Sequence, residues 1–373
     1  MKARLGDFIQ EYSVRNKAFE DIPVYSVTNM QGFCRDYFGK EVASKDKSTY
    51  KIVPKGCFAF NPSRINVGSV DWQRYEDRVI VSPLYNVFSV SPQLDQQYLY
   101  YYLKSDFALQ RIRTVATGSV RDNLKLDMLY EFPIDILDVE KQKDITHLLD
   151  TVKQVIALRS KELLTLDNLI KARFVEMFGD VKTNSMNWPT KPLKELCDIS
   201  RGGSPRPIIN YLGETVPWIK IGDATDGDNI YINSTKEHII EDGVKKSRYI
   251  KAGSLIFANC GVSLGFCRII TFNGCIHDGW LAFQNIDSTL DKVFLLMTIN
   301  QLTDYFRSIA PGGTQPNLNT EIMGNYQQII PPKELQQEFI EFARQVDKSK
   351  FVVQQALDKA QLLFDSLMQK YFG

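Results

Sequence analysis

The chain has 373 residues, of which 44% are hydrophobic and 24% are charged, as is typical of a globular protein with two or three domains. Its net charge is +1, with 45 basic and 44 acidic residues. This balance argues against a protein that neutralises many DNA phosphates alone. A nucleic-acid role would need local basic patches or a basic partner.

The opening MKARLGDFIQEYSV lacks the apolar core of a signal peptide, and no run of 18 apolar residues predicts a membrane span. We therefore expect a cytoplasmic protein whose six cysteines, none in a CxxC pair, are reduced. Cys260, Cys267, Cys275 and His277 are close enough in sequence to suggest a zinc site. Their spacing fits no structural zinc pattern, so we expect buried thiols on strands and no metal.

Short β-rich runs separated by Gly, Pro, Asn and Asp predict a mixed α/β or β-rich domain over residues 1–117. These runs are YKIVPKG (50–56), CFAF (57–60), RVIVS (78–82) and YNVFSV (85–90). One helical stretch, 95–112, follows them.

A helical segment, 118–179, comes next and begins with the loop sequence GSVRDNL. From Ile145 onward, positions spaced alternately by four and three residues form a seam in which eight of ten residues are apolar. A period of 3.5 residues held over more than four heptads indicates a coiled coil. The segment ends at Gly179, which is typical of a helix stop.

The segment 180–311 has the same pattern of short β-rich runs as the first domain and predicts a second mixed α/β or β-rich domain. Its β-rich runs are VPWIKIGD (216–223), RYIKAGSLIFA (248–258), FCRIITF (266–272) and WLAFQN (280–285). A helical stretch, 291–309, again follows.

The last segment, 312–373, repeats 118–179 at a constant offset of 194 residues. GGTQPNL (312–318) stands against GSVRDNL (118–124), and Phe372-Gly373 stands against Phe178-Gly179. The chain is therefore two copies of one unit. The second seam is apolar or aromatic at nine of ten positions, so the two helices can pair with each other over roughly 50 Å. Two amphipathic helices packed on separate cores are the alternative.

This order of elements resembles the specificity subunit of a type I restriction–modification system. The likeness rests on GGTQPNL followed by IIPPKELQQEFI (329–340), on RGGSPRP (201–207) ahead of VPWIKIGD, and on GVSLG (261–265). The first half departs from the pattern. It has GSVRDNL without the second Gly or the Pro, and FEDIPVYSV where the second half has RGGSPRP.

The resemblance implies an α+β fold with two mixed α/β target-recognition domains separated by two long conserved helices that pair as an antiparallel coiled coil. Each domain would read half of a bipartite, asymmetric double-stranded DNA target in the major groove. The helices would hold the two halves apart by more than one DNA turn of about 34–36 Å. The implied partners are two methyltransferase (modification) subunits and the restriction/translocase subunits, with no cofactor on this chain.

Base readers are expected to be basic, amide or hydroxyl side chains on loops, because these match the donors and acceptors on base edges. The candidates are Arg35, Asn61, Arg64 and Asn66 in the first domain, and Arg201, Ser204, Arg206, Lys220 and Ser263 in the second. Each is otherwise a solvated cation or a turn cap. Candidates for the partner surface are the polar pairs that the repeat matches, Glu140 with Glu334 and Gln142 with Gln336, for which roles in helix capping are the alternative.

Catalysis is not expected. The chain has no Asn/Asp-Pro-Pro-aromatic methyltransferase motif, no GxGxxG and no GxxxxGK[ST] phosphate loop. His277-Asp278 has the composition of an acid–base pair, but no nucleophile motif accompanies it. Two other hypotheses remain at this point. One is a coiled-coil scaffold whose end domains bind protein or carbohydrate, and the other is the specificity component of a related two-subunit cutting-and-modifying enzyme.

Overall fold

The computed structural model describes residues 2–35, 46–116, 123–224, 230–311 and 317–373. It divides into two compact units: the first comprises Met1–Lys161 with Val353–Gly373, and the second comprises Glu162–Val352. Each unit thus combines one globular part with portions of both long helices. The predicted domain boundaries stay a prediction. Of GSVRDNL and GGTQPNL, only residues 123–124 and 317–318 lie within the described part of the chain.

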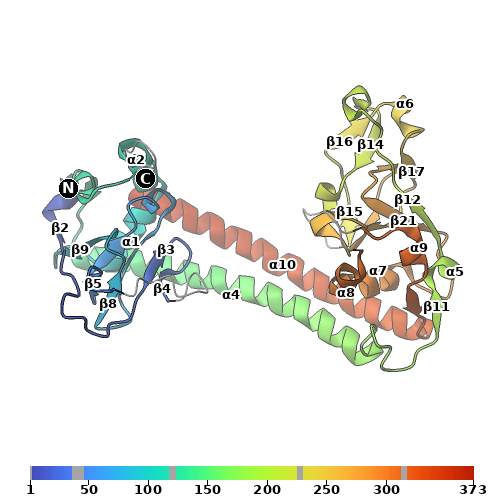
Figure 1. Cartoon of the computed structure of the whole chain (residues 1–373), viewed down its shortest axis with the longest axis horizontal. Helices are drawn as coiled ribbons and strands as arrows, with labels where there is room; N and C mark the ends of the chain where they lie inside the picture. The colour runs from blue at the N-terminus through green and yellow to red at the C-terminus, as the bar shows by residue number, and fades with distance from the viewer. Residues whose placement is uncertain (1, 36–45, 117–122, 225–229, 312–316) are drawn as a thin grey trace. The chain divides into compact units, whose positions relative to one another are not determined.

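The first unit contains a four-stranded antiparallel sheet, in the order β2-β9-β6-β7, and two separate strand pairs, β3-β4 and β5-β8. Strands β1 and β10 form a further antiparallel pair. The strands are β1 (Lys2–Arg4), β2 (Ile9–Glu11), β3 (Ser26–Thr28), β4 (Gly32–Cys34), β5 (Lys51–Pro54), β6 (Phe58–Phe60), β7 (Val70–Trp72), β8 (Arg78–Val81), β9 (Asn86–Val90) and β10 (Pro133–Asp135). The short helices are α1 (Gln96–Lys104), α2 (Asp106–Val115) and α3 (Leu126–Tyr130) (Figure 1).

The second unit contains two five-stranded sheets, in the orders β12-β21-β18-β19-β15 and β13-β16-β14-β20-β17, and the pair β11-β22. The strands are β11 (Thr190–Pro192), β12 (Asp198–Arg201), β13 (Leu212–Gly213), β14 (Val216–Ile219), β15 (Tyr231–Ile232), β16 (Glu237–Ile239), β17 (Arg248–Ile250), β18 (Leu255–Ala258), β19 (Cys267–Ile270), β20 (Gly274–Ile276), β21 (Trp280–Gln284) and β22 (Gln327–Ile329). The short helices are α5 (Leu193–Leu196), α6 (Glu241–Val244), α7 (Lys292–Gln301), α8 (Thr303–Ile309) and α9 (Thr320–Gly324).

The internal repeat is visible in the sheets. The order β2-β9-β6-β7 of the first unit returns as β12-β21-β18-β19 in the second, with antiparallel pairing throughout. The central strands β6 and β18 are buried on both faces, since their alternate side chains enter different cores. This double burial explains why CFAF and SLIFA are continuous apolar runs.

The two long helices are α4 (Val139–Phe178) and α10 (Lys333–Phe372), each of 40 residues and related by the 194-residue offset. In the first unit, the beginning of α4 shares a core with the end of α10. In the second unit, the end of α4 shares a core with the beginning of α10. The helices therefore pair in opposite directions, which confirms the predicted antiparallel coiled coil (Figure 1). Every position of both predicted seams is buried or half-buried.

The end of each long helix completes the core of a unit through an aromatic contact. Phe178 packs against Phe294 of α7 in the second unit, with ring centroids 4.9 Å apart. Phe372 packs against Tyr98 of α1 in the first unit at the same separation of 4.9 Å. Gly179 terminates α4 with φ of +74°. The C-terminal residues of the chain thus stabilise the domain formed by its N-terminal residues.

The predicted partner residues Gln142 and Gln336 are corrected by the structure, because both side chains are 0% exposed. Gln336 accepts a hydrogen bond from the backbone N–H of Asp291 and donates to two backbone carbonyls. Gln142 makes the equivalent three bonds around Asp95 in the first unit. These carboxamides join each long helix to the N-cap of α1 or α7, so they are internal braces with no surface for a partner.

The two predicted helical stretches, 95–112 and 291–309, each form two helices. Ser105 ends α1 and begins α2, and its hydroxyl accepts from Ala108 N and donates to Tyr102 O. A serine that bonds the backbone in this way competes with continuous helix. In the second unit the break falls at Leu302.

Candidate nucleic-acid interface

The segment RGGSPRP follows β12 and lies against the turn 277–279 that joins β20 to β21. The N–H of Gly202 donates to Trp280 O at 2.9 Å, and the N–H of Gly203 donates to Ile276 O at 2.9 Å. A Cβ added at Gly202 would overlap the carbonyl oxygens of His277 and Ile276. Only glycine therefore allows this approach of two backbones, which fixes the segment next to the turn.

Asp278, in this turn, is the centre of the candidate interface. Its Oδ1 accepts a hydrogen bond from Ser204 Oγ at 2.8 Å and lies 2.9 Å from His277 Nε2. The guanidinium of Arg206 lies 3.6 Å from Oδ2. Arg201 Nε donates to the backbone carbonyl of Asp278 at 3.1 Å. The structure thus brings three of the predicted DNA-binding residues, Arg201, Ser204 and Arg206, around one residue, Asp278.

The protonation states of the turn follow from these contacts. His277 Nδ1 accepts the N–H of Gly279 at 2.9 Å, so the proton of the neutral ring is on Nε2. Burial lowers the pKa of His277, and the nearby Asp278 only partly offsets this effect. Burial would raise the pKa of Asp278. The hydrogen bond from Ser204 and the charges of His277, Arg206 and Arg201 outweigh burial, so the net pKa is lowered. At pH 7 Asp278 is an anion and His277 is neutral.

Lys220 belongs to the same neighbourhood. It follows β14, its ammonium lies 5.4 Å from the ring centroid of Trp218, and it forms an ion pair with Glu237 of β16. The Trp218 ring in turn contacts the His277 ring, with centroids 5.6 Å apart. Lys220 is therefore connected to the turn 277–279 through the ring of Trp218, which contacts both Lys220 and His277.

Ser263 lies elsewhere in the second unit. It ends the 3₁₀ turn Gly261–Ser263, and the next residues contact α8: Leu264 O accepts from Arg307 Nε and Gly265 O accepts from Thr303 Oγ1. Within the part of the chain that the structure describes, no contact joins Ser263 to Asp278. Its role in DNA binding stays a prediction.

Sequence reasoning missed two features of this interface. It considered His277 and Asp278 as an acid–base pair and His277 as a metal ligand, whereas the turn that contains them holds the segment 201–207. It also missed Arg248, at the start of β17, whose Nε donates to Arg201 O at 3.3 Å. The available signal was the sequence HDG between two strand-like runs, which predicts a polar turn at a sheet end.

The first unit places its candidates differently. Asn61 and Arg64 line a hollow of about 530 Å³ beside the β3-β4 hairpin. The other lining residues are Ser26, Val27, Thr28, Asn29, Met30, Gln31, Val67, Ser69 and Tyr85. Asn61 Oδ1 caps its own turn by accepting from Ser63 N and Oγ, while Arg64 is exposed. The polar hairpin tip at residues 29–31 is a further feature that sequence reasoning missed.

Arg35 and Asn66 are not brought into this hollow. Arg35 forms an ion pair with Glu76 at 2.8 Å and lies over the ring of Tyr25. Asn66 is in the 3₁₀ turn Ile65–Val67 and is half-buried. The four candidates of the first unit therefore form no single cluster.

The hairpin that borders this hollow is held by Asp71. Its Oδ2 accepts the N–H of Phe33, and a Cβ added at Gly32, where φ is +62°, would overlap this carboxylate. Burial raises the pKa of Asp71, although the adjacent Arg74 partly offsets it. The hairpin is thus fixed to β7 by a buried polar group.

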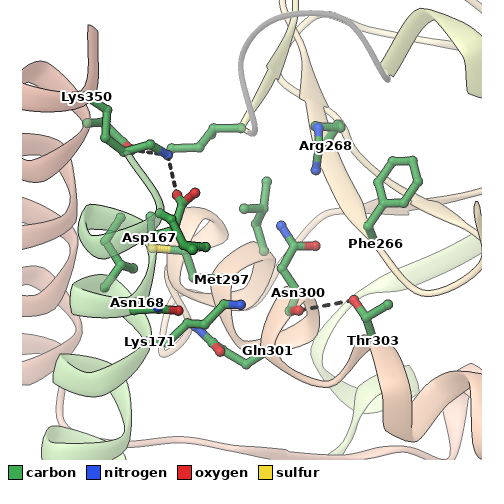
Figure 2. Close-up of a pocket in the computed structure, with 15 residues that line it drawn as sticks. Asp167, Asn168, Lys171, Phe266, Arg268, Met297, Asn300, Gln301, Thr303 and Lys350 are labelled. Carbon is green, nitrogen blue, oxygen red and sulfur yellow. Dashed lines mark hydrogen bonds and ion pairs between the residues drawn. The ribbon is translucent and has the colours of Figure 1, made fainter. Parts of the chain in front are cut away.

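A second hollow, of about 380 Å³, lies beside the helix pair in the second unit (Figure 2). Its edge is formed by Lys350 of α10, which bonds Asp167 of α4 at 2.7 Å, and by Lys171. Apolar side chains such as Phe266 and Met297 line the remainder. The hollow of the first unit related to it by the repeat, lined by Phe107 and Phe364, measures about 140 Å³.

The remaining predictions concern the cysteines, a metal site, a membrane span and the two glutamates of the partner surface. Cys267 and Cys275 are buried on β19 and β20, which confirms their interpretation as strand thiols. The same interpretation is wrong for Cys260, which is half-buried and lies outside the named strands. Among the described residues, no group of three His, Cys, Asp or Glu side chains is arranged to hold a metal. None of the described helices is long and apolar enough to cross a membrane. Glu140 and Glu334 are exposed at the beginnings of the long helices.

Comparison with known proteins gives two relatives of modest identity. The specificity subunit of the type I restriction enzyme MjaIX from Methanocaldococcus jannaschii is 24% identical over 178 residues, which cover 45% of this chain and 40% of that protein. The HindI specificity subunit from Haemophilus influenzae is 26% identical over 160 residues, covering 40% and 33%. The matches thus span less than half the length of these relatives.

Solved structures match over the whole chain. A chain from a structure of the complex assembly and conformational transition of the type I R-M system has a TM-score of 0.66 and 17% identity, covering 100% of this chain and 97% of that one. The type I restriction–modification S subunit from M. genitalium has a TM-score of 0.56 and 14% identity, covering 100% and 96%. These likenesses concern the fold.

The family model described as the type I restriction modification DNA specificity domain matches twice, at residues 4–168 and 186–359. The two matches cover most of the chain and coincide with its two repeats. The chain therefore belongs to the family of type I restriction modification DNA specificity domains.

Proposed function

We propose that this chain is the sequence-specific DNA-binding subunit of a type I restriction–modification complex. It recognises a bipartite, asymmetric target and directs the methyltransferase and restriction subunits to it. The observation that carries this proposal is that the chain contains two domains of one family with the same strand order. The polar side chains at the sheet ends differ between these two domains. A repeated scaffold suits two half-sites, and unlike surfaces suit half-sites of unlike sequence.

The second unit supplies the better defined reader. Arg201, Ser204 and Arg206 offer guanidinium and hydroxyl groups, which match the acceptors of base edges and phosphates. Lys220 extends the same surface. In the first unit, Asn61 and Arg64 line a hollow, and Arg35 and Asn66 lie apart from it. The proposal therefore places the contacts of the first half-site mainly on Asn61, Arg64 and the hairpin tip.

The partner surface is proposed on the exposed sides of the long helices. Leu158 and Val352 are large exposed apolar residues at equivalent positions of α4 and α10, and so are Leu169 and Leu363. Equivalent apolar positions on both helices suit a partner that binds twice, such as two methyltransferase subunits. Glu140 and Glu334 stay candidates for the same surface.

The chain itself is proposed to be non-catalytic and to need no cofactor. Its curated relatives are specificity subunits, and the His277–Asp278 pair is engaged in holding a loop. Chemistry on DNA would then come from the partner subunits.

The experiment is to co-express the chain with the modification subunit of its own system and to map methylated bases across the host genome. We expect a split motif with two fixed halves. Exchanging residues 180–311 for those of a related chain should change one half, and exchanging 1–117 should change the other. A complex that forms but methylates without sequence preference would refute the proposal. The alternative of a coiled-coil scaffold predicts no complex and no motif.

A further inference from the structure

Asp278 is an unusual residue for a surface that is proposed to bind DNA. Its side chain is one-third exposed and lies next to two cations, Arg201 and Arg206, and a carboxylate in that place repels phosphate. A residue that only repelled DNA would weaken the interface, so its contacts need another explanation.

The contacts of Asp278 are of two kinds. Ser204 Oγ donates to Oδ1 at 2.8 Å, which is an ordinary hydrogen-bond length. Arg206 lies farther away, at 3.6 Å from Oδ2, and its side chain is 82% exposed. The bond from Ser204 holds the segment 201–207 against the turn. The contact with Arg206 is a loose ion pair that a competing anion can replace.

We propose that Asp278 is a positioning residue that determines the specificity of the second unit. Through Ser204 it fixes the segment RGGSPRP, and it holds Arg206 nearby until the guanidinium binds DNA. Without cognate DNA, its negative charge also weakens binding to phosphates that make no base contacts. The inference rests on the proposed function, which it extends to a residue that need not contact a base.

The first unit offers an internal comparison. Strand pairing relates β9 to β21 at an offset of 195 residues, because Phe88 pairs with Phe58 of β6 as Phe283 pairs with Leu255 of β18. This offset places Pro83 at the position of Asp278, and a proline cannot hold a polar loop by charge. Substitution of Asp278 should therefore affect only the half-site read by the second unit.

The test uses the purified complex of the whole chain with its modification subunit, after the methylated motif of the wild type is known. Asp278→Asn removes the charge and keeps one oxygen as an acceptor. Asp242→Asn, at an exposed acid of α6 in the same unit, is the matched control for charge. Dissociation constants are measured for the cognate duplex, for duplexes with either half-site scrambled, and for one with both scrambled.

For Asp278→Asn we expect discrimination against a scrambled second half-site to fall at least about fivefold. Affinity for the fully scrambled duplex should rise about threefold at low salt, because a repulsive charge is gone. Discrimination at the first half-site should be unchanged, and Asp242→Asn should alter neither discrimination. A merely structural defect would lower both affinities, which distinguishes it from positioning.

Unchanged discrimination, or the same response from both variants, would overturn the inference and leave the proposed function intact. A wild-type complex without any sequence preference would overturn both. If Asp278→Asn fails to fold, Ser204→Ala serves instead, since it keeps the carboxylate and removes one donor. It should reduce discrimination at the second half-site without raising affinity for the scrambled duplex, and a rise there would count against the inference.

Discussion

Replacing Gln336 by alanine measures how strongly the internal brace between α10 and α7 stabilises the second unit. The side chain is 0% exposed and makes hydrogen bonds to Asp291 N, Thr289 O and Pro331 O at 2.8, 2.9 and 2.8 Å. An intramolecular hydrogen bond contributes about 1 kcal/mol net, and a buried group left unpaired costs somewhat more. We therefore expect Gln336→Ala to lower the free energy of unfolding of the second unit by about 3 kcal/mol.

The assay is hydrogen exchange with mass spectrometry, which follows the two units separately in one chain. Gln337→Ala is the control, because Gln337 is exposed and makes one side-chain bond, to Asp291 Oδ2 at 3.0 Å. Gln337→Ala should lower the free energy of unfolding of the second unit by no more than about 0.5 kcal/mol. If both variants lowered it equally, or if Gln336→Ala lowered it by less than about 1 kcal/mol, Gln336 would not be a stabilising brace.

Three more results are expected. Gly202→Ala forces a Cβ onto backbone carbonyls, so filter binding should show weaker affinity for the second half-site and unchanged affinity for the first. Neutral His277 stabilises the fold above about pH 6.5, because its pKa is lowered by burial, and this contribution is lost as the pH falls. The protection of the amides in the turn 277–279, after correction for the pH dependence of intrinsic exchange, should therefore fall on acidification, and less so in His277→Gln. Phe372→Ala, which leaves Tyr98 without its aromatic partner, should cost the first unit about 3–5 kcal/mol in urea unfolding.

Each of these results has a contrary outcome. A Gly202→Ala variant with wild-type affinity for both half-sites would show that the segment does not need its close approach. If acidification changed the hydrogen exchange of the turn equally in wild type and in His277→Gln, His277 would not be the group responsible for the pH dependence. Loss of stability in the second unit, rather than the first, would contradict the assignment of Phe372.

The helices and the repeat were predictable because their signals are local. The seam positions recur every 3.5 residues, and every one of them is buried or half-buried. Burial on both faces left the central strands as uninterrupted apolar runs, which predicted strands but not their order. Local signals gave the wrong interpretation for Gln142 and Gln336. A polar residue that is matched between the two copies suggests a surface position. The carboxamides of these residues instead bond backbone groups about 45 residues away and others next to the start of their own helix.

The site was less predictable because its contacts join distant segments. Arg201, Ser204 and Arg206 were identified from a glycine-rich sequence with two arginines. Their common partner lies more than 70 residues farther along the chain, in a turn that is polar but otherwise ordinary. No periodicity connects these segments; strand pairing of β12 with β21 does.

The distribution of likeness between the two halves carries its own argument. The features that repeat most closely are the length of the long helices, the glutamine braces and the terminal aromatic contacts, and all of them maintain the scaffold. The features that differ are at the sheet ends, where the second unit has Asp278 and the first has Pro83, and where a cluster of arginines in the second unit corresponds to a polar hollow in the first. A chain that repeats its frame and varies these ends presents a different surface in each of its two units. Such an arrangement favours recognition of two unlike half-sites over recognition of a palindrome, because identical surfaces would be needed for the latter.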